Sequence, residues 1–335
     1  MTQTHSVTLL FSDGISAHLA VPHGDRLVEA AAQAGLGLLM DCSNGQCGTC
    51  AARCVSGTVE LGDYDASVLP DDEREDGAIL CCVSTVTAPA VIELPYESSE
   101  ASADEPPAQQ GRVLAVTPVA EEVIRLDVEV PEAIRFLPGQ YVRLKPAGQS
   151  EWRSYSMANR SGERHLVFYI RVVEKGAFST WLTTDAGTGS ALEVGPARGS
   201  FFLRNEPRPR LFVAGGTGVA PFMAMLEQIV QDSEQARSVP TRLLIGARTG
   251  GHFFGQQALD ALRARIAGLE VVYAAEAQAP QGVHPGYATD LIAPGSITPD
   301  TRVYLCGPPP MVEAARAAAV KAGARKSDVL CERFA

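Results

Sequence analysis

The sequence has no long apolar run and no basic start. Along its 335 residues no stretch approaches the roughly 20 uninterrupted apolar residues of a membrane span. The opening MTQTHSVTLLFSDG lacks the charged start and apolar run of a signal peptide. We therefore expect a soluble cytoplasmic protein with no membrane partner. Its eight cysteines do not predict a disulfide framework, because the cytosol keeps thiols reduced.

Basic side chains are scarce in the first part of the chain. Residues 1–98 hold 3 Lys or Arg and 14 Asp or Glu, whereas residues 99–335 hold 25 of each sign. The whole net charge of −11 therefore belongs to the N-terminal segment. This balance argues against nucleic acid as a partner. It indicates either a solvated surface that aids solubility or an acidic docking face for a basic protein partner.

The composition divides the chain into three domains and a linker. A mass of 35.5 kDa exceeds that of an ordinary single domain. Residues 98–109 have no apolar side chain larger than Ala or Pro, which predicts a linker. Residues 1–97 combine short strands, a helix and a cysteine loop in a small α+β unit. Residues 110–207 contain β-rich runs typical of an antiparallel barrel, and in residues 208–335 strands alternate with helices, as in a parallel sheet.

The strongest motif is the cysteine loop DCSNGQCGTC at residues 41–50. Its C-x4-C-x2-C spacing, followed at a distance by further cysteines, is the plant-type [2Fe–2S] pattern. Gly45 and Gly48 let the backbone bend so that N–H groups turn toward sulfur. Structural zinc is the alternative, but its C-x2-C knuckles usually come in pairs and here there is one. The predicted ligands are Cys42, Cys47, Cys50 and either Cys81 or Cys82, while Cys54 is interpreted as a packed thiol in a strand.

A second motif, Arg153-Ser154-Tyr155-Ser156, resembles the R-x-Y-S motif of the ferredoxin–NADP reductase superfamily. A guanidinium can bind a pyrophosphate, an aromatic ring can cover an isoalloxazine, and a hydroxyl can hydrogen-bond flavin N5. Alone, such a tetrapeptide is more often a surface strand. Residues 175–182, KGAFSTWL, resemble the superfamily's second flavin segment. There a turn at Gly176 opens a helix whose Ser179 and Thr180 N–H groups would face phosphate, unless they form a plain helix cap. Arg171 is a candidate for the same phosphates.

Two glycine segments near the C-terminus suggest a nicotinamide site. The run VAGGTGVAP at 213–221 follows a strand and opens a helix, but it is not G-x-G-x-x-G. It resembles the G-G-T-G-x-A-P turn of the same superfamily, and CGPPPM at 306–311 resembles its C-G-P-x-x-M segment, whose cysteine stands beside nicotinamide. A buried core thiol is the alternative for that cysteine. The predicted contacts are Gly215, Gly216, Thr217, Gly218, Cys306, Gly307 and Pro308. Phe334 either covers the flavin or plugs the core as an apolar tail.

The choice between NADH and NADPH depends on the end of the second strand of the parallel sheet. An acid there would bind a free ribose 2′-hydroxyl, but residues 246–252 contain none. His252 stands where NADH-using relatives often carry Asp, and Arg248 can accommodate a 2′-phosphate. We favour NADH because the oxygenase reductases of the superfamily mostly use it.

Together the three segments resemble the single-chain reductase of a bacterial multicomponent oxygenase of the benzoate or anthranilate type. The resemblance implies a β-grasp ferredoxin domain, an antiparallel β-barrel FAD domain and a Rossmann-like NAD domain. It also implies Cys82 as the fourth ligand, because GAILCC at 77–82 resembles Gly-x-Val-Leu-x-Cys. Electrons would pass from NADH through FAD and the cluster, one at a time, to a terminal oxygenase docked on the acidic domain. The implied catalytic residues are Tyr155, Ser156 and Cys306.

Other functions stay open at this point. The chain can instead be the reductase of a soluble diiron monooxygenase, which would share the same three domains. It can also be a redox-sensing flavin and iron–sulfur module without rapid turnover, or a flavin reductase that releases free reduced flavin.

Overall fold

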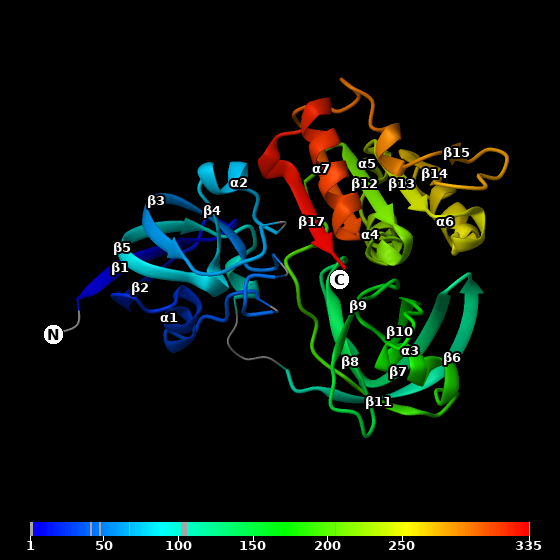
Figure 1. Cartoon of the computed structure of the whole chain (residues 1–335), viewed down its shortest axis with the longest axis horizontal. Coiled ribbons are helices and arrows are strands. Elements are labelled where there is room, and N and C mark those ends of the chain that lie inside the picture. The colour runs from blue at the N-terminus through cyan, green and yellow to red at the C-terminus, as the bar shows by residue number, and fades with distance from the viewer. Residues whose placement is uncertain are drawn as a thin grey trace. The chain divides into compact units, whose positions relative to one another are not determined.

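The computed structural model describes all residues except 1–2, 41, 47, 67, 102–105, 205 and 335. The chain forms two compact units (Figure 1). One comprises residues 1–106 with Arg198–Ser200, and the other comprises residues 107–197 and 201–335. Among the helices in the described ranges, none combines the length and the apolar character needed to cross a bilayer.

The N-terminal unit is built on a five-stranded sheet of order β2-β1-β5-β3-β4. β1 and β5 run parallel, whereas the other neighbours are antiparallel. α1 buries Leu27, Val28, Ala30 and Ala31. This arrangement confirms the predicted β-grasp domain. Its elements are β1 (Thr4–Leu10), β2 (Ser16–Pro22), α1 (Leu27–Gln33), β3 (Ala51–Leu61), α2 (Asp71–Glu75), β4 (Ala78–Leu80) and β5 (Ser84–Glu93).

The linker is shorter than its composition predicts. Ser98–Glu100 form a 3-10 turn, and the Ser98 hydroxyl donates to Asp13 Oδ2 at 2.6 Å. Ala101 is buried, and its carbonyl accepts a hydrogen bond from Gly37 N. The composition of this segment does not show that the Asp13 carboxylate binds Ser98 and thereby fixes the start of the segment. The first residues of the predicted linker therefore belong to the folded N-terminal unit.

The next domain is a six-stranded antiparallel sheet of order β10-β7-β6-β11-β8-β9. After β9, the Ala158 N–H donates to the Val167 carbonyl of β10 at 2.8 Å, which joins the two edges of the sheet. This closure confirms the predicted barrel. Its elements are β6 (Gln109–Ala120), β7 (Val123–Ile134), β8 (Tyr141–Pro146), β9 (Arg153–Ser156), β10 (Glu163–Arg171), α3 (Ala177–Thr184) and β11 (Ala191–Val194).

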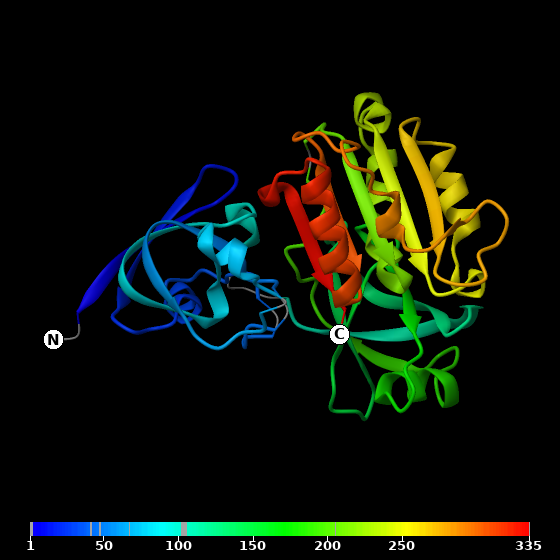
Figure 2. The ribbon, with the colours of Figure 1, turned by 45° about the horizontal axis from the view of Figure 1, so that its top comes forward.

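The last domain is a sheet of order β15-β14-β13-β12-β16-β17 whose strands all run parallel. Both faces are buried, so strands such as β12 read as continuous apolar runs. α4 and α6 pack in the core on one face, and α7 packs on the other (Figure 2). The elements are β12 (Arg210–Gly215), α4 (Ala220–Gln231), α5 (Glu234–Ser238), β13 (Thr241–Ala247), α6 (Gln256–Arg263), β14 (Leu269–Ala275), β15 (His284–Pro285), β16 (Arg302–Gly307), α7 (Pro309–Ala322) and β17 (Val329–Arg333).

The barrel and the parallel-sheet domain share one hydrophobic core. The ring of Tyr169 on β10 lies 4.6 Å from that of Phe254, which precedes α6. Phe201, after the barrel strands, lies 6.0 Å from Phe222 on α4. All four side chains are buried in the same cluster. These two domains are therefore packed as a single unit.

A buried carboxylate stabilises the barrel. Asp127 on β7 is 6% exposed and accepts two hydrogen bonds from Arg125, at 2.7 and 2.8 Å. His165 Nε2 lies 2.7 Å from Asp127 Oδ1. Burial alone would raise the pKa of Asp127, but the hydrogen bonds from Arg125 and His165 outweigh it and lower that pKa below its ordinary value.

We expect Asp127→Asn to destabilise the barrel by about 2 kcal/mol, because the hydrogen bonds from Arg125 and His165 lose the charge of the carboxylate that accepts them. A carboxyl with a lowered folded pKa stabilises fully above its ordinary pKa of about 3.9 and loses that contribution as pH falls through the folded value. The measurement is urea unfolding at pH 7 and at successively lower pH, with exposed Glu132→Gln as control. Equal unfolding midpoints for the two variants at pH 7 would contradict the prediction.

Candidate functional site

The described cluster cysteines come together in the N-terminal unit. Cys82 N donates to Cys50 Sγ at 3.4 Å. A hydrogen bond from the Cys50 side chain, followed by smaller ones from the Gly45 N–H and the Cys42 side chain, lowers the pKa of Cys82 to about 6 in spite of burial. Cys50 and Cys42 therefore each lie against Cys82, which follows the end of β4. Cys47 lies outside the described residues.

The loop backbone fits an iron–sulfur cluster. Gln46 N donates to Cys42 Sγ at 3.2 Å. Gly45 has φ +75°, and a Cβ there would lie 2.7 Å from Tyr64 Cβ, so the turn requires glycine. Amides aimed at thiolate sulfur stabilise the charge of such a cluster. The described residues by themselves hold no group of three or more His, Cys, Asp or Glu side chains able to bind a metal ion. The predicted ligand set is completed only by Cys47.

Cys81 and Cys54, which lie near the predicted cluster ligands in the sequence, have different surroundings. Cys81 is fully buried, and burial together with the nearby charge of Cys82 raises its pKa to about 12, so its thiol stays protonated. Cys54 donates its thiol to Ser56 O at 3.4 Å, and burial raises its pKa as well. The contacts of Cys82 with Cys50 and Cys42, two other predicted ligands, favour Cys82 as the fourth ligand, as the resemblance implies.

The two segments predicted to bind flavin meet in the barrel. Arg153 and Tyr155 lie on β9, which pairs with β8. The Tyr155 ring lies 4.9 Å from Phe178 on α3, and burial raises the pKa of its phenol. Arg153 is half-exposed and pairs with Glu151 at 2.5 Å. An aromatic wall and an accessible guanidinium therefore stand on one strand, as a flavin dinucleotide requires.

The start of α3 corrects part of the prediction. The helix begins at Ala177 after Gly176. Thr180 N donates to Gly176 O at 2.8 Å, so the prediction that this N–H faces a phosphate is wrong. The Ser179 hydroxyl is buried and accepts from Val173 N at 2.9 Å. The first-turn amides from Ala177 to Ser179 remain as candidate phosphate donors, because a helix leaves its first N–H groups without helical partners.

The glycine segments meet at the carboxyl edge of the parallel sheet. β12 ends at Gly215, and Gly216–Val219 form a 3-10 turn that leads into α4. Adjacent β16 ends at Gly307. A Cβ on Gly218 would lie 2.2 Å from Cys306 O, whereas a Cβ on Gly216, at φ +54°, would meet no atom within 4 Å. This edge therefore combines close backbone packing with an open turn, which is where α/β sheets bind dinucleotides.

Three family models match successive parts of the chain. A 2Fe-2S iron-sulfur cluster binding domain matches residues 10–87, an oxidoreductase FAD-binding domain matches residues 110–202, and an oxidoreductase NAD-binding domain matches residues 212–317. The toluate 1,2-dioxygenase electron transfer component of Pseudomonas putida is 33% identical over 99% of both chains. The corresponding anthranilate 1,2-dioxygenase component of Acinetobacter baylyi is 32% identical over 93% of this chain and 92% of its own.

The chain belongs to this family of dioxygenase electron transfer components. The cytochrome P450 reductase of Amycolatopsis shares the fold, with a TM-score of 0.71 at 24% identity and coverage of 98% of each chain. As a family member, the chain is an oxidoreductase that combines iron–sulfur, FAD and NAD domains. The site residues named above are candidates for binding these groups.

Sequence reasoning missed Glu332 in this reductase. The Ser156 hydroxyl donates to Glu332 Oε2 at 3.3 Å, and the Cys306 thiol lies 3.6 Å from the same oxygen. Burial, followed by the charge of Glu332, raises the pKa of Cys306 well above its ordinary value, so this group is a neutral thiol. Glu332 faces Cys306 in the pairing of β17 with β16. The signal that could have found Glu332 was the VLCER run at 329–333, which forms strand β17.

The remaining candidates lie near these groups. Phe334 continues the pairing after β17, where its N–H donates to Gly307 O at 3.0 Å, and its ring packs against the shared core. Its role as a flavin cover stays a prediction. Arg171 and Arg248 both approach Glu122 on the turn between β6 and β7. A phosphate bound by either arginine would therefore have to compete with the Glu122 carboxylate.

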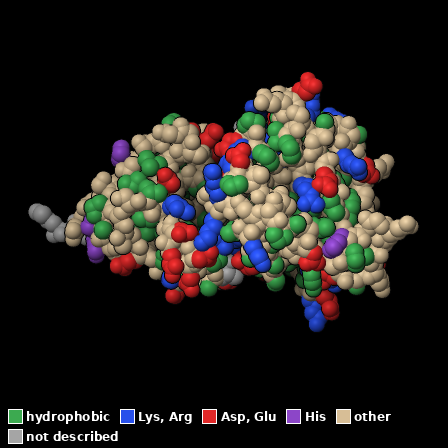
Figure 3. Space-filling view, turned by 90° about the horizontal axis from the view of Figure 1, so that it is seen from above, with side chains coloured by type: hydrophobic (Ala, Val, Ile, Leu, Met, Phe, Trp, Pro, Cys, Tyr) green, Lys and Arg blue, Asp and Glu red, His purple; other side chains and the backbone are tan. Residues whose placement is uncertain are grey.

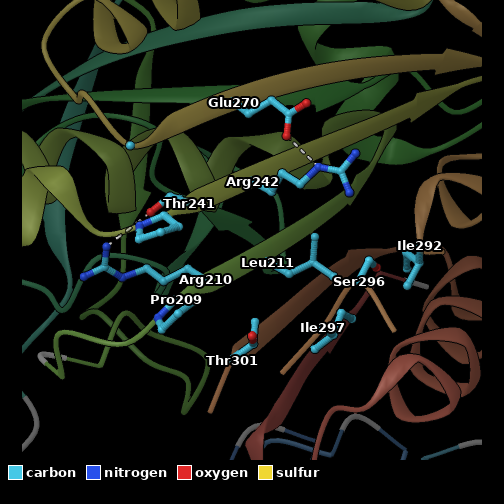
Figure 4. A pocket seen from close by; sticks show the side chains of 12 residues that line it. Pro209, Arg210, Leu211, Thr241, Arg242, Glu270, Ile292, Ser296, Ile297 and Thr301 are labelled. Carbon is cyan, nitrogen blue, oxygen red and sulfur yellow. Dashed lines mark hydrogen bonds and ion pairs between the residues drawn. The ribbon is translucent and has the colours of Figure 1, made fainter. Parts of the chain in front are cut away.

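A pocket of about 200 Å³ opens at the opposite edge of the sheet (Figure 4). It lies at the amino ends of β12 and β13, beside Leu211 and Thr241. Its charged groups are engaged, because Arg242 Nε donates to Glu270 Oε2 at 2.6 Å and Arg210 Nη1 donates to the Thr241 hydroxyl at 3.3 Å. The pocket is thus separate from the carboxyl edge that carries the glycine turns.

Proposed function

We propose that this chain passes electrons from NADH to the terminal oxygenase of an aromatic-ring dioxygenase and docks that partner on its ferredoxin domain. The relatives named for toluate and anthranilate dioxygenases support the choice of partner. The observation that carries the proposal is the convergence of Cys42, Cys50 and Cys82 in a domain with an acidic surface. The three-domain boundaries at 1–97, 110–207 and 208–335 enclose the ranges that the family models match.

The docking surface consists of the exposed acidic side chains of α2 and the residue after it, Asp71, Asp72, Glu75 and Asp76. Arg74 is the one basic residue between positions 54 and 98, and it pairs with Asp71 at 2.9 Å. β4 leads directly from this acidic surface to Cys81 and Cys82. Acidic side chains are visible on the N-terminal part of the molecule in Figure 3. A basic partner attracted to α2 would therefore arrive close in sequence to a cluster ligand.

The residues of the flavin and nicotinamide domains have distinct tasks. Bound flavin would supply hydride acceptance and release of single electrons, and the iron–sulfur cluster would supply one-electron transfer. Tyr155 and Phe178 would exclude water from a bound flavin, and Arg153 would bind its pyrophosphate. Glu332, which accepts a hydrogen bond from the Ser156 hydroxyl, would hold that side chain in place beside a bound flavin. Cys306, whose pKa burial raises, would present an uncharged thiol to a bound nicotinamide.

An anaerobic titration with NADH tests the electron path. We expect visible absorption to report reduction of flavin and electron paramagnetic resonance to report a reduced [2Fe–2S] centre in the same sample. The reduced chain is then mixed with the oxygenase component of toluate 1,2-dioxygenase, toluate and oxygen, and a dihydroxylated product is expected. A colourless protein, or zinc without labile sulfide, contradicts the proposal. A reduced chain that supports a diiron monooxygenase but no ring dioxygenase contradicts the choice of partner.

Docking on α2 predicts a strong salt response. With cytochrome c as a basic protein probe, we expect NADH-driven reduction to slow about tenfold as ionic strength rises from about 10 mM to 0.5 M, because screening removes electrostatic steering. Asp72→Asn with Glu75→Gln is expected to flatten this dependence, whereas Glu132→Gln in the barrel is expected to leave it unchanged. The same salt response in the α2 variant and the parent would rule out steering through α2.

A further inference from the structure

We propose that Glu122, a residue of the flavin domain, sets the preference for NADH by occupying Arg248 at the place where the 2′-phosphate of NADPH would bind. This inference rests on the proposed use of NADH and names the residues that select it. The sequence offers no acid in the loop after β13. The structure brings one there from a turn 126 residues earlier.

The position of Arg248 follows from the topology of the sheet. Gly215 at the end of β12 pairs with Gly246 near the end of β13. A dinucleotide whose pyrophosphate lies at the turn after β12 extends its adenosine ribose toward the carboxyl end of the next strand. Arg248 is the first residue after β13. Its guanidinium is therefore the cation within reach of a phosphate on the ribose 2′-oxygen.

The Arg248 guanidinium already has partners. Its Nη2 atom donates both to Glu122 Oε2 and to His252 Nε2, the second at 2.8 Å. His252 Nδ1 lies 2.8 Å from the Thr249 hydroxyl. The Arg248 and Glu122 side chains are about half-exposed, so this ion pair contributes little to folding. The ion pair matters for ligand binding instead, because a 2′-phosphate would have to displace the Glu122 carboxylate from the Arg248 guanidinium.

The carboxylate of Glu121 also lies at the loop after β13 and adds to the negative charge of Glu122. Glu121 Oε2 lies 3.4 Å from His252 Nδ1, and Glu121 N donates to Gly251 O at 2.9 Å. A Cβ on Gly251 would lie 2.2 Å from Glu121 Oε1, so the Glu121 carboxylate lies directly against this loop. The loop after β13 thus faces two acidic side chains from the barrel. A phosphate ester, with a charge of about −1.5 to −2 at neutral pH, would be repelled there.

Backbone hydrogen bonds fix the turn that carries these two carboxylates. Glu121 and Glu122 are the two residues between β6 and β7, and Glu122 has φ +57°. The Glu122 carbonyl accepts a hydrogen bond from Val172 N at 2.7 Å. Arg171 Nε lies 3.9 Å from Glu122 Oε2, so a second cation helps to orient the carboxylate. Because the barrel and the parallel-sheet domain share a core, the turn stays in register with the β13 loop.

The test compares two ligands that differ by one phosphate, 5′-AMP and adenosine 2′,5′-bisphosphate, by calorimetric titration of the full-length holoprotein. We expect the parent to bind the bisphosphate no more tightly than 5′-AMP. Glu122→Gln is expected to bind the bisphosphate about tenfold more tightly than the parent does. In this variant the Arg248 guanidinium is free to donate a charge-assisted hydrogen bond to the 2′-phosphate, and one such bond accounts for an effect of this size. Binding of 5′-AMP should not change. The ratio of kcat/KM for NADPH to that for NADH should rise by the same factor.

Three controls make the result specific. Glu132→Gln removes a barrel carboxylate distant in sequence and is expected to match the parent. Adding Arg248→Gln to Glu122→Gln is expected to abolish the gain, because the freed guanidinium is its source. Glu121→Gln, which serves if Glu122→Gln fails to fold, is expected to give a smaller gain in the same direction.

The proposal is overturned by a parent that prefers the bisphosphate, by a gain that survives loss of Arg248, or by no gain in either glutamine variant. None of these readouts depends on an oxygenase, so a failure here is distinguishable from failure of the proposed function.

Discussion

Cys82→Ser is expected to abolish NADH-driven reduction of cytochrome c, whereas Cys81→Ser is expected to retain it. Cys82 lies against two other predicted ligands, since its N–H donates to Cys50 Sγ at 3.4 Å and its side chain accepts a hydrogen bond from Cys42. Cys81 is a buried thiol with a pKa raised to about 12. Loss of a ligand should exceed the roughly 10–100-fold loss that follows removal of an outer-shell partner.

The measurement uses two electron acceptors, cytochrome c and ferricyanide, together with electron paramagnetic resonance of the reduced protein. Ferricyanide, which accepts electrons from flavin, should still be reduced by NADH in Cys82→Ser, showing that the flavin and nicotinamide domains remain folded. Electron paramagnetic resonance of the dithionite-reduced protein should show the cluster signal in Cys81→Ser and lack it in Cys82→Ser. The reverse pattern would move the fourth ligand to Cys81.

Gly218→Ala is expected to slow reduction of the flavin by NADH about 100-fold, because displacement of reacting groups by about 1 Å can cost that much. An alanine Cβ would lie 2.2 Å from Cys306 O and 2.7 Å from Cys306 C. Both atoms belong to the backbone of β16, so the clash moves the end of that strand and not a flexible side chain. The displacement falls between the glycine turn and Cys306, where the nicotinamide is proposed to bind.

Gly187→Ala is the matched control, since a Cβ there meets no atom within 4 Å. Rapid-mixing absorption measures flavin reduction by NADH, and dithionite reduction of the same samples reports the cluster independently. We expect both glycine variants to keep their FAD and their cluster signal. Parent-like flavin reduction in Gly218→Ala would show that this turn does not position the nicotinamide.

The sequence predicts best those features that depend on residues close together in the chain. Cysteine spacing, the RSYS strand and the glycine turn each contain their chemistry within a few residues. All three domain folds were predicted because strand and helix periodicity is likewise local. The linker was predicted too long because composition does not reveal that Asp13 anchors Ser98 from 85 residues away.

Features built across the fold were missed. Glu332 reaches Ser156 over a separation of 176 residues, from β17, a strand that the sequence analysis did not predict. Glu122 reaches Arg248 from another domain, so a search for an acid in the β13 loop could not find it. The Thr180 error has a different cause. A Gly-x-x-Ser-Thr pattern indicates a helix start but does not show which amide enters the helical ladder first.

The shared core of the barrel and parallel-sheet domains determines how this reductase can be recombined with others. A graft that exchanges residues 1–106 leaves the Phe201–Phe222 and Tyr169–Phe254 contacts intact, but Arg198–Ser200, which belong to the N-terminal unit, have to be exchanged with it. A cut between the two later domains would instead expose Phe222 and its neighbours to water. Chimeras divided there should be insoluble unless both halves come from the same parent.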